Sequence, residues 1–430
     1  MADLLIRNGL LLGASSGAER ADIVVDKGRI VSVGPVGSLG GFRREIDASN
    51  HAVMPGFVNC HGHGAMTLLR GIGDDLPLQQ WLEEEMWPRE ERLDGEAVYW
   101  GTMLAIAEML KGGTTTFTDM YFFMDDVARA VEETGIRAVL SRGMIGTDED
   151  KGSSRMEESK EFVSRWHGAA GGRISAMLGP HAPYTCSQGY LSRVADLSAQ
   201  LAVPVQIHIS ETSYEVETSL AQHGKTPVGM VRDSGLMDRP LIAAHCVDLR
   251  QGDIDILAEK GVTVAHNPGS NLKLGSGIAP VPQLLDKGVV VGLGTDGAAS
   301  NNNLDMMEEM RLAALIHKGL NRQPTLMPVE TAFCMATENG GRALFLEDVG
   351  RLEPGCRADI VLLSLNRPHL TPGHNILSHV VYAAQPADVD TVIVDGRVLV
   401  EKGRLVEMDE EKIIAEAERC ARRICGEKND

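Results

Sequence analysis

The middle of the chain alternates short apolar runs, rich in β-branched residues, with longer stretches that carry apolar residues on one helical face. This alternation is typical of parallel βα units. The runs that we predict as strands cover residues 53–60, 114–119, 136–142, 174–179, 203–209, 241–245, 262–266 and 289–295. Eight such strands with helices between them predict an α/β fold, a distorted (β/α)8 or TIM barrel.

Capping residues mark the predicted helices between these strands. A helix over 94–111 begins at Asp94 and ends before Gly112, because an acidic N-cap and a glycine after the last turn are common helix boundaries. A second helix over 304–318 ends at Gly319 by the same reasoning.

Both ends of the chain follow a different pattern, in which apolar and polar residues alternate and two-residue turns interrupt the runs. We predict turns at Asn8-Gly9, Lys27-Gly28, Asp395-Gly396 and Lys402-Gly403. Turn dipeptides of this kind between alternating apolar runs are typical of β-hairpins.

The similar ends suggest a single domain, since chain termini usually lie close together. We expect a small β-sandwich domain built from residues 1–56 and 349–430, with the barrel of 57–348 inserted between them. A final helix over 409–424 should pack on the rest of the protein. Its predicted apolar stripe consists of Ile413, Ile414, Ala417, Ala421 and Ile424.

Composition and charge indicate an ordinary globular protein. The chain has 430 residues, of which 43% are hydrophobic and 23% are charged, and its formal net charge is −19. An acidic protein without clusters of Lys and Arg is not expected to bind nucleic acid or an anionic membrane. No run of about 20 mainly apolar residues is present to cross a bilayer.

Cysteine usage and the N-terminus predict a cytoplasmic enzyme. The seven cysteines are scattered, odd in number and never arranged as CxxC, so neither a disulfide framework nor a zinc ribbon is indicated. The first residues contain Asp3 and no basic lead, unlike a signal peptide. A homo-oligomer is compatible with these features.

Two histidines follow the first predicted barrel strand in "MPGFVNCHGHGAMTLLRG". His61 and His63 are two residues apart, so on a strand both rings point the same way, as metal ligands do. An HxH pair near a glycine-rich turn also occurs without any site, with its rings solvated or bonded to the backbone. The pair therefore needs further ligands to indicate a metal.

Further ligand-type residues stand at the ends of other predicted strands. They are His208 and Glu211 in "QIHISET", His245 in "AAHCV", His266 in "VAHNPGSN" and Asp296 in "GLGTDG". Barrel enzymes build their sites at the carboxyl ends of the strands. Because such residues occur at five strand ends, the sequence predicts a metal centre rather than scattered core histidines.

This ordered set resembles the amidohydrolase superfamily, whose metal-dependent (β/α)8 barrels carry HxH, His, His and Asp at strands one, five, six and eight. Within it, "HGHGAMTLLRG", "HISET" and "GTDGAASNNNLDMMEEM" resemble the 5-methylthioadenosine/S-adenosylhomocysteine deaminase family, a relative of the triazine hydrolases. The resemblance spans nearly the whole chain. It implies a hydrolase that converts the 6-amino group of a 5′-substituted adenosine, with a small-molecule nucleoside as substrate.

The resemblance also implies the metal ligands, which are His61, His63, His208, His245 and Asp296. Neutral imidazoles with one carboxylate suit Zn²⁺ or Fe²⁺, which bring the pKa of water toward ~7. Binuclear relatives use a carboxylated lysine on strand four, but "RISAMLGPHAPYT" has no lysine and no cysteine. We therefore expect one ion per chain.

Three residues receive catalytic roles from the resemblance. Glu211 is expected to transfer a proton to the ring nitrogen, and Asp296 to take and return the proton of the attacking water. His266 is suited to orienting that water or stabilising the adduct. Without His208 three residues away, Glu211 would instead be interpreted as an acid that favours a helix start.

The loops after the strands are expected to bind the substrate. The predicted contacts are Trp81, Glu90, Arg142, Arg155, His181, Glu211 and Ser300. Glu90 is expected to accept hydrogen bonds from the ribose, and Arg142 and Arg155 to bind the amino-acid carboxylate of S-adenosylhomocysteine. Trp81 is equally explained as a helix core residue, Glu90 as one acid in an exposed run, and Arg155 as part of a solvated loop.

Two other interpretations remain. The same barrel can act on another aminated heterocycle: adenosine, 5′-deoxyadenosine, guanine, cytosine or a chlorotriazine. It can also be a non-catalytic assembly protein, which would be free to lose ligands, whereas every ligand position is filled here. Trp81 with Glu90 favours a nucleoside over a free base, and the HxE and PCxxC motifs of the compact zinc deaminases are missing.

Overall fold

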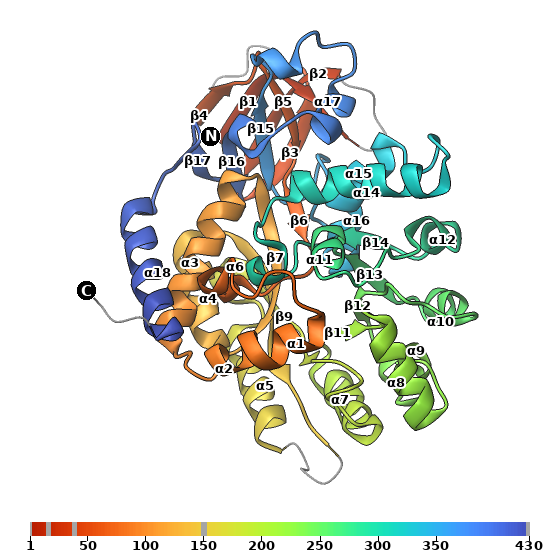
Figure 1. Cartoon of the computed structure of the whole chain (residues 1–430). Coiled ribbons are helices and arrows are strands. Elements are labelled where there is room, and N and C mark those ends of the chain that lie inside the picture. Colours follow the sequence, from red (N-terminus) through yellow and green to blue (C-terminus); the bar gives the residue numbers. More distant parts are fainter. Residues whose placement is uncertain (1, 14–18, 37–40, 148–152, 427–430) are drawn as a thin grey trace.

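The computed structural model describes residues 2–13, 19–36, 41–147 and 153–426. Figure 1 shows a central region of short strands surrounded by helices, and a large sheet at one end that contains strands from both ends of the chain. None of the helices in the described ranges combines the length and apolar character that a membrane crossing requires.

The central strands form two parallel sheets. The first contains β6 (Phe57–Asn59), β7 (Thr114–Tyr121), β8 (Arg137–Met144), β9 (Ile174–Ala176) and β10 (Gly179–Pro180). The second contains β11 (Val205–Ile209), β12 (Leu241–His245), β13 (Thr263–His266) and β14 (Val291–Leu293). Each of the eight predicted strands has a counterpart, but two are divided: the fourth into β9 and β10, and the first, predicted over 53–60, into a strand over His51–Pro55 outside the barrel and β6.

Backbone hydrogen bonds join the two sheets at both edges. Cys60 N donates to Leu293 O at 2.8 Å, beside β6 and β14, and Gln206 N donates to Leu178 O at 2.9 Å, between β10 and β11. The strands thus complete the predicted distorted barrel. Because the strands are parallel, their carboxyl ends all lie on one side of the barrel, which is its open side.

Helices surround the barrel, as parallel strands require a crossover on the outside. The longer ones are α3 (Gly95–Lys111), α4 (Met124–Thr134), α5 (Ser153–Trp166), α7 (Gln188–Leu201), α8 (Ser213–His223), α14 (Met306–Asn321) and α15 (Val329–Ala336). The shorter ones are α6 (Ala169–Gly172), α9 (Pro227–Asp233), α10 (Asp253–Glu259), α12 (Val281–Asp286) and α16 (Glu338–Ala343). Helix α17 (Ile376–Tyr382) follows the barrel in the chain and packs against α14 and α15.

Short helices on the open side of the barrel lie near the ends of strands. They are a 3₁₀ helix (Gly64–Leu69), α1 (Leu78–Gln80), a π-helical segment (Trp81–Met86), α2 (Trp87–Glu90), α11 (Pro268–Lys273) and α13 (Ala298–Asn301).

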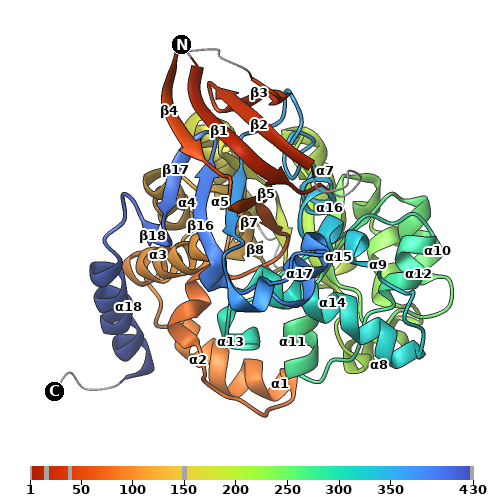
Figure 2. The ribbon, with the colours of Figure 1, turned by 90° about the horizontal axis from the view of Figure 1, so that it is seen from above.

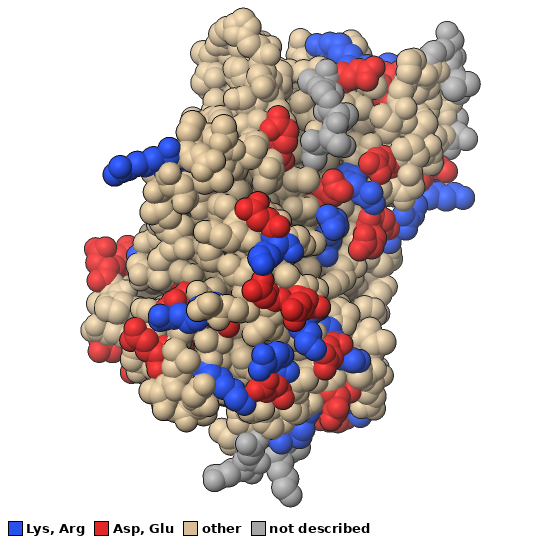
Figure 3. Space-filling model, turned by 90° about the vertical axis from the view of Figure 1, so that its right-hand side faces the viewer, with Lys and Arg blue, Asp and Glu red and all other residues tan. Residues whose placement is uncertain are grey.

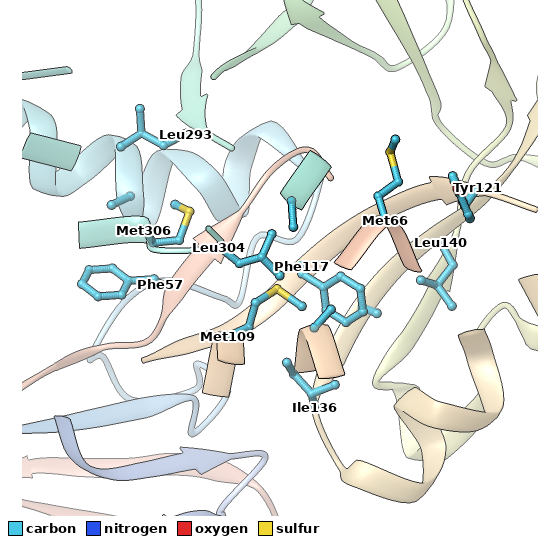
Figure 4. Close-up of a cluster of buried hydrophobic side chains, with 14 of the residues drawn as sticks. Phe57, Met66, Met109, Phe117, Tyr121, Ile136, Leu140, Leu293, Leu304 and Met306 are labelled. Atoms are coloured by element: carbon cyan, nitrogen blue, oxygen red, sulfur yellow. The ribbon is translucent and has the colours of Figure 1, made fainter. Parts of the chain in front are cut away.

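The main core fills the space between the strands and the outer helices. Phe117 of β7 lies beside Met109 of α3 and near Ile136, all within one buried cluster (Figure 4). Removing a buried aromatic ring such as Phe117 typically destabilises a protein by about 3–5 kcal/mol. This core holds the strand ends in fixed relative positions.

The two chain ends meet in one nine-stranded sheet (Figure 2). Its strands are β1 (Ala2–Leu11), β2 (Glu19–Asp26), β3 (Arg29–Gly34), β4 (Phe42–Asp47), β5 (His51–Pro55), β15 (Ile360–Ser364), β16 (Val389–Val394), β17 (Arg397–Glu401) and β18 (Arg404–Leu405). Antiparallel pairing of β5 with β15 joins the N-terminal strands to the C-terminal ones. Side chains that include Leu4, Ile23 and Ile360 form a separate buried cluster.

Three of the four predicted turns are present, and one is not. Lys27-Gly28, Asp395-Gly396 and Lys402-Gly403 lie between paired strands with positive φ at both residues. Asn8-Gly9 instead lies inside β1, where the register with β2 shifts. Asn8 adopts a left-handed φ of 56°, and its N–H donates to Asp22 at 2.8 Å, so the dipeptide forms a bulge and not a hairpin turn.

Two helices differ from prediction in detail. Helix α14 continues past Gly319 to Asn321, because no positive φ interrupts it before Arg322. The last helix, α18 (Glu410–Cys425), packs on α3 (Figure 1) and buries Ile413, Ala417, Cys420 and Ile424, whereas Ile414 is 53% exposed. The buried stripe follows the 3.6-residue period, on which Cys420 lies and Ile414 does not.

The surface mixes both signs of charge. On the face shown in Figure 3, Lys and Arg side chains alternate with Asp and Glu over the described residues. Many charged side chains of the described residues form ion pairs, for example Arg419 of α18 with Glu96 of α3 at 2.7 Å.

Candidate active site

Histidine and aspartate side chains from four strand ends converge at the open side of the barrel. Two groups have ligand atoms within 4.8 Å of one another: His61, His208 and His245 form one, and His61, His63 and Asp296 form the other. His61 belongs to both groups, so the five residues form one cluster. Asp296 Oδ1 lies 3.5 Å from His61 Nε2 and 3.3 Å from His63 Nε2.

Oxygen acceptors fix the orientation of three rings. Nδ1 of His63 lies 2.7 Å from Met120 O, and Nδ1 of His208 lies 2.7 Å from His181 O. Nδ1 of His245 lies 3.1 Å from Asn271 Oδ1. An imidazole that donates from Nδ1 keeps the lone pair of Nε2 for a metal, so the acceptors select the ligand tautomer.

Burial and mutual contacts set the charge of the cluster. Burial lowers the pKa of His61 to about 4 and that of His208 well below its usual value, which keeps both rings neutral. Burial would raise the pKa of Asp296, but the close approach of the His61 and His63 rings to its Oδ1 holds it well below its usual range. Burial would lower the pKa of His63, but its contact with Asp296 raises it to about 9. The cluster thus offers neutral imidazoles at His61 and His208 and an ionised carboxylate at Asp296, the forms that bind metals, and an ion that binds Nε2 of His63 takes the place of its proton.

Glycine is required at one position beside the cluster. Gly64 N donates to Oδ2 of the buried Asp119 at 3.0 Å. A Cβ atom at residue 64 would come within 2.8 Å of that same oxygen, closer than ordinary contacts permit. The glycine after the HxH motif therefore allows the backbone to approach Asp119.

A cavity of about 940 Å³ opens above the cluster. It is lined by all the predicted site residues except His61 and His266. Glu211 lies in the loop between β11 and α8, is 7% exposed, and places Oε2 3.7 Å from His245 Nε2. Burial raises the pKa of Glu211, which favours a protonated carboxyl group that can donate to a ligand.

The loop of Glu211 is held by a second buried acid. Glu215 accepts from Ser210 N at 3.2 Å and from Glu211 N at 2.8 Å. These two hydrogen bonds fix the backbone that carries the Glu211 side chain.

Trp81 and Glu90 come from the segment between β6 and α3. Trp81 is 3% exposed and donates from Nε1 to Ile72 O at 3.3 Å, so it serves both the core and the cavity wall. Glu90 Oε1 accepts from the hydroxyl of Tyr121 at 2.7 Å. Glu90 is therefore a half-buried cavity residue and not one acid in an exposed run.

Ser300 and His181 also reach the cavity. Ser300 Oγ donates to Asp296 Oδ2 at 2.9 Å, and Ser270 Oγ donates to the same atom at 2.6 Å. Ser300 thus contacts the cluster as well as the cavity. His181 Nδ1 lies 2.9 Å from Thr185 Oγ1, which orients its ring.

Arg142 and Arg155 line the outer part of the cavity. Arg142, near the end of β8, contacts the carboxylate of Glu158. Arg155 lies on α5 and not in a loop, and it donates to Ile145 O at 3.3 Å. The preceding residues 148–152, predicted as part of that loop, lie outside the described residues.

His266 is the predicted catalytic residue that the structure does not bring to the cavity. Its neighbour Ala265 packs with the residues inside the barrel, so alternation along β13 turns His266 to the other side. There its ring lies 6.0 Å from that of His317 on α14. The expected contact of His266 with the reacting groups is therefore corrected.

Sequence reasoning did not identify several residues that support the site. They are Asp119, Tyr121, Glu158, Glu215, Ser270 and Asn271. Four of them had a signal, because Asp119 ends the predicted strand 114–119, Tyr121 lies two residues beyond it, and Ser270 and Asn271 lie in the quoted "VAHNPGSN" segment. Glu158 had none, because it lies on an outer helix.

Comparisons with known proteins agree with this arrangement. A model described as "Amidohydrolase family" matches residues 52–399. The chain is 53% identical over 430 residues to a 5-methylthioadenosine/S-adenosylhomocysteine deaminase of Pelotomaculum thermopropionicum, with 99% of each chain covered. It is 46% identical over 433 residues to a 5′-deoxyadenosine deaminase of Methanosarcina mazei, with 100% of each covered. The structure of a Xanthomonas campestris adenosine deaminase with bound zinc matches with a TM-score of 0.92 at 38% identity, over 99% of both chains.

Proposed function

The chain belongs to the amidohydrolase family, and from the geometry of its site we propose that it is a metal-dependent hydrolytic deaminase of 5′-substituted adenosines. It converts the 6-amino group of 5′-methylthioadenosine or S-adenosylhomocysteine to a carbonyl, giving the inosine derivative and ammonia. The position of Glu211 carries this proposal. Its buried carboxyl group lies 3.7 Å from His245 Nε2, in a cavity whose wall contains Glu90.

The histidine cluster fits a bound metal ion. Among the described residues, buried His61 Nε2 has no hydrogen-bond partner, as expected of an atom reserved for a ligand. The ion would be held by His61, His63, His208, His245 and Asp296. It is one Zn²⁺ ion per chain, or Fe²⁺ in its place, because the residues around β9 and β10 offer no bridging lysine. When bound, such an ion lowers the pKa of water and supplies hydroxide near neutral pH.

Glu211 and Asp296 move the protons of the reaction. Glu211 donates a proton to N1 of the adenine ring while the water oxygen adds to C6, and Asp296 accepts the proton that this water loses. Asp296 then protonates the amino group, which leaves as ammonia, and the hydroxyl proton of the adduct returns to Glu211 as the carbonyl forms. Ser270 and Ser300 hold Asp296 Oδ2, so that Oδ1 faces the histidines.

The cavity wall binds the nucleoside. Because Tyr121 already donates to Oε1 of Glu90, Oε2 remains to accept from the ribose hydroxyls. Trp81 provides an apolar wall, and His181 contacts the base or sugar. At the outer end, Arg142 and Arg155 bind the carboxylate of a long 5′-substituent.

A screen for ammonia release tests this function. The purified, zinc-loaded chain is assayed with adenosine, 5′-methylthioadenosine, S-adenosylhomocysteine, 5′-deoxyadenosine, guanine and cytosine. We expect the highest kcat/KM with a 5′-substituted adenosine. Greater activity on a free base would contradict the nucleoside assignment, and no activity on any of them would contradict deamination.

A further inference from the structure

One face of α5 forms part of the outer cavity wall. Arg155, Glu158, Phe162 and Arg165 line the cavity and are separated by three or four positions. Residues with this spacing lie on the same side of a helix. This face therefore presents two cations, an anion and an apolar ring to whatever occupies the outer cavity, and Glu161 adds a second acid of α5 to the lining.

The charges on this face are not equally available. Arg165 Nη1 lies 2.7 Å from Asp125 Oδ1 and is thereby paired. Among the described residues, no carboxylate lies within 4.0 Å of the Arg155 guanidinium, which donates to a backbone carbonyl. Arg142 is different, because the chain itself supplies a carboxylate to it from Glu158.

The two partners differ in how firmly they are held. Arg142 is on β8 of the barrel, and its side chain is 23% exposed, whereas the Glu158 side chain is 46% exposed on α5. When the Glu158 carboxylate leaves the pair, water can solvate it, because the side chain is already half exposed. The more buried guanidinium is costly to leave without an anion.

We propose that Glu158 determines specificity by occupying Arg142 in place of a substrate carboxylate. The inference rests on the proposed function and adds to it. A substrate with a short apolar 5′-group, such as 5′-methylthioadenosine, leaves the Arg142–Glu158 pair intact. To bind at Arg142, a substrate with a terminal carboxylate, such as S-adenosylhomocysteine, must displace Glu158, because two carboxylates repel each other at one guanidinium.

Apolar side chains near this pair suit the short substituent. Phe122, Ile145 and Phe162 line the same outer region. With Arg142 paired to Glu158, a methylthio group meets apolar side chains here and not an unpaired charge on Arg142. Glu158 therefore favours uncharged substituents over anionic ones.

Glu158→Gln tests the proposal, since it keeps the size of the side chain and removes its charge. We expect the ratio of kcat/KM for S-adenosylhomocysteine to that for 5′-methylthioadenosine to rise at least roughly fivefold, because an anionic competitor is lost at Arg142. Glu157→Gln is the matched control. Glu157 is the neighbouring acid on α5, is 60% exposed, pairs with Lys160 and does not line this cavity. The ratio of kcat/KM for the two substrates in Glu157→Gln should therefore stay within about twofold of wild type.

A cationic substrate reverses the expected sign. 5′-(3-Aminopropylthio)adenosine carries an ammonium group where S-adenosylhomocysteine also has a carboxylate. Glu158→Gln exposes the charge of Arg142 to this group, so kcat/KM for the amine should fall relative to 5′-methylthioadenosine. An equal rise for both charged substrates would show that the substitution merely opens the cavity, and would overturn the proposal.

A double-mutant cycle identifies Arg142 as the point of action. In an Arg142→Met background, Glu158→Gln should change the substrate ratio by less than about twofold, because the contested group is gone. An undiminished effect would overturn the mechanism through Arg142. If wild type deaminates 5′-methylthioadenosine but the ratio is unchanged in Glu158→Gln, only this inference is wrong. If wild type deaminates no adenosine derivative, the proposed function fails as well.

Discussion

The hydroxyl of Tyr121 donates a hydrogen bond of 2.7 Å to Oε1 of Glu90. Tyr121 is the last residue of β7, and Glu90 is the last residue of α2, so the bond connects the barrel to the segment that covers the cavity. Both side chains line the cavity. The contact therefore positions the carboxylate that we propose as the ribose acceptor.

Tyr121→Phe should weaken nucleoside binding. The ring stays, but Glu90 loses the hydrogen bond that fixes it, and a bond to a charged group contributes about 1.5–3 kcal/mol. We expect KM for 5′-methylthioadenosine to rise roughly fivefold or more, with a smaller change in kcat. Tyr99→Phe is the control, because Tyr99 donates to Glu133 at 2.6 Å in an exposed pair outside the cavity. Equal effects of both substitutions would refute a specific role for Tyr121.

Glu90→Ala should lower kcat/KM for 5′-methylthioadenosine at least tenfold, the factor that corresponds to ~1.4 kcal/mol. The reason is the loss of hydrogen bonds to the ribose 2′ and 3′ hydroxyls. A 2′-deoxy analogue lacks one of these hydroxyls and should lose much less when Glu90 is removed, since deletions that affect one contact are non-additive. Equal losses for the ribose and deoxyribose substrates would mean that Glu90 does not bind the sugar.

Metal analysis should find about one transition-metal ion per chain, because four histidines and one aspartate converge on a single cluster. A chelator should remove activity, and Zn²⁺ should restore it. His63→Ala should reduce the metal content, whereas His379→Ala, on α17 outside the cavity, should not. A stoichiometry near two, or full activity of the metal-free protein, would contradict the proposed mononuclear site.

Glu211→Gln should leave the metal content near that of wild type and reduce kcat by roughly 10²-fold or more, because the amide keeps the size of the side chain but cannot donate and recover the proton. Glu217→Gln on α8 is the matched control, since its side chain is 73% exposed and does not line the cavity. Loss of metal in Glu211→Gln would instead identify Glu211 as a ligand.

The periodicity of the sequence was sufficient to predict the barrel and the place of its site. Eight β-rich runs alternate with helical stretches, and parallel strands necessarily bring their carboxyl ends to one side. Polar residues that end five of these runs could therefore be expected to meet. His61 and His208, 147 positions apart, lie with ring centroids 4.8 Å apart for this reason.

Only the tertiary structure decided which way individual side chains point and what they contact. His245 and Asp296 have positive φ angles of 73° and 60°, so strand alternation does not apply to them. His266 keeps that alternation and faces outward. Glu158 reaches Arg142 only because α5 packs beside the end of β8. Local sequence specifies the period of an element, whereas such contacts depend on how separate elements pack, which no local pattern encodes.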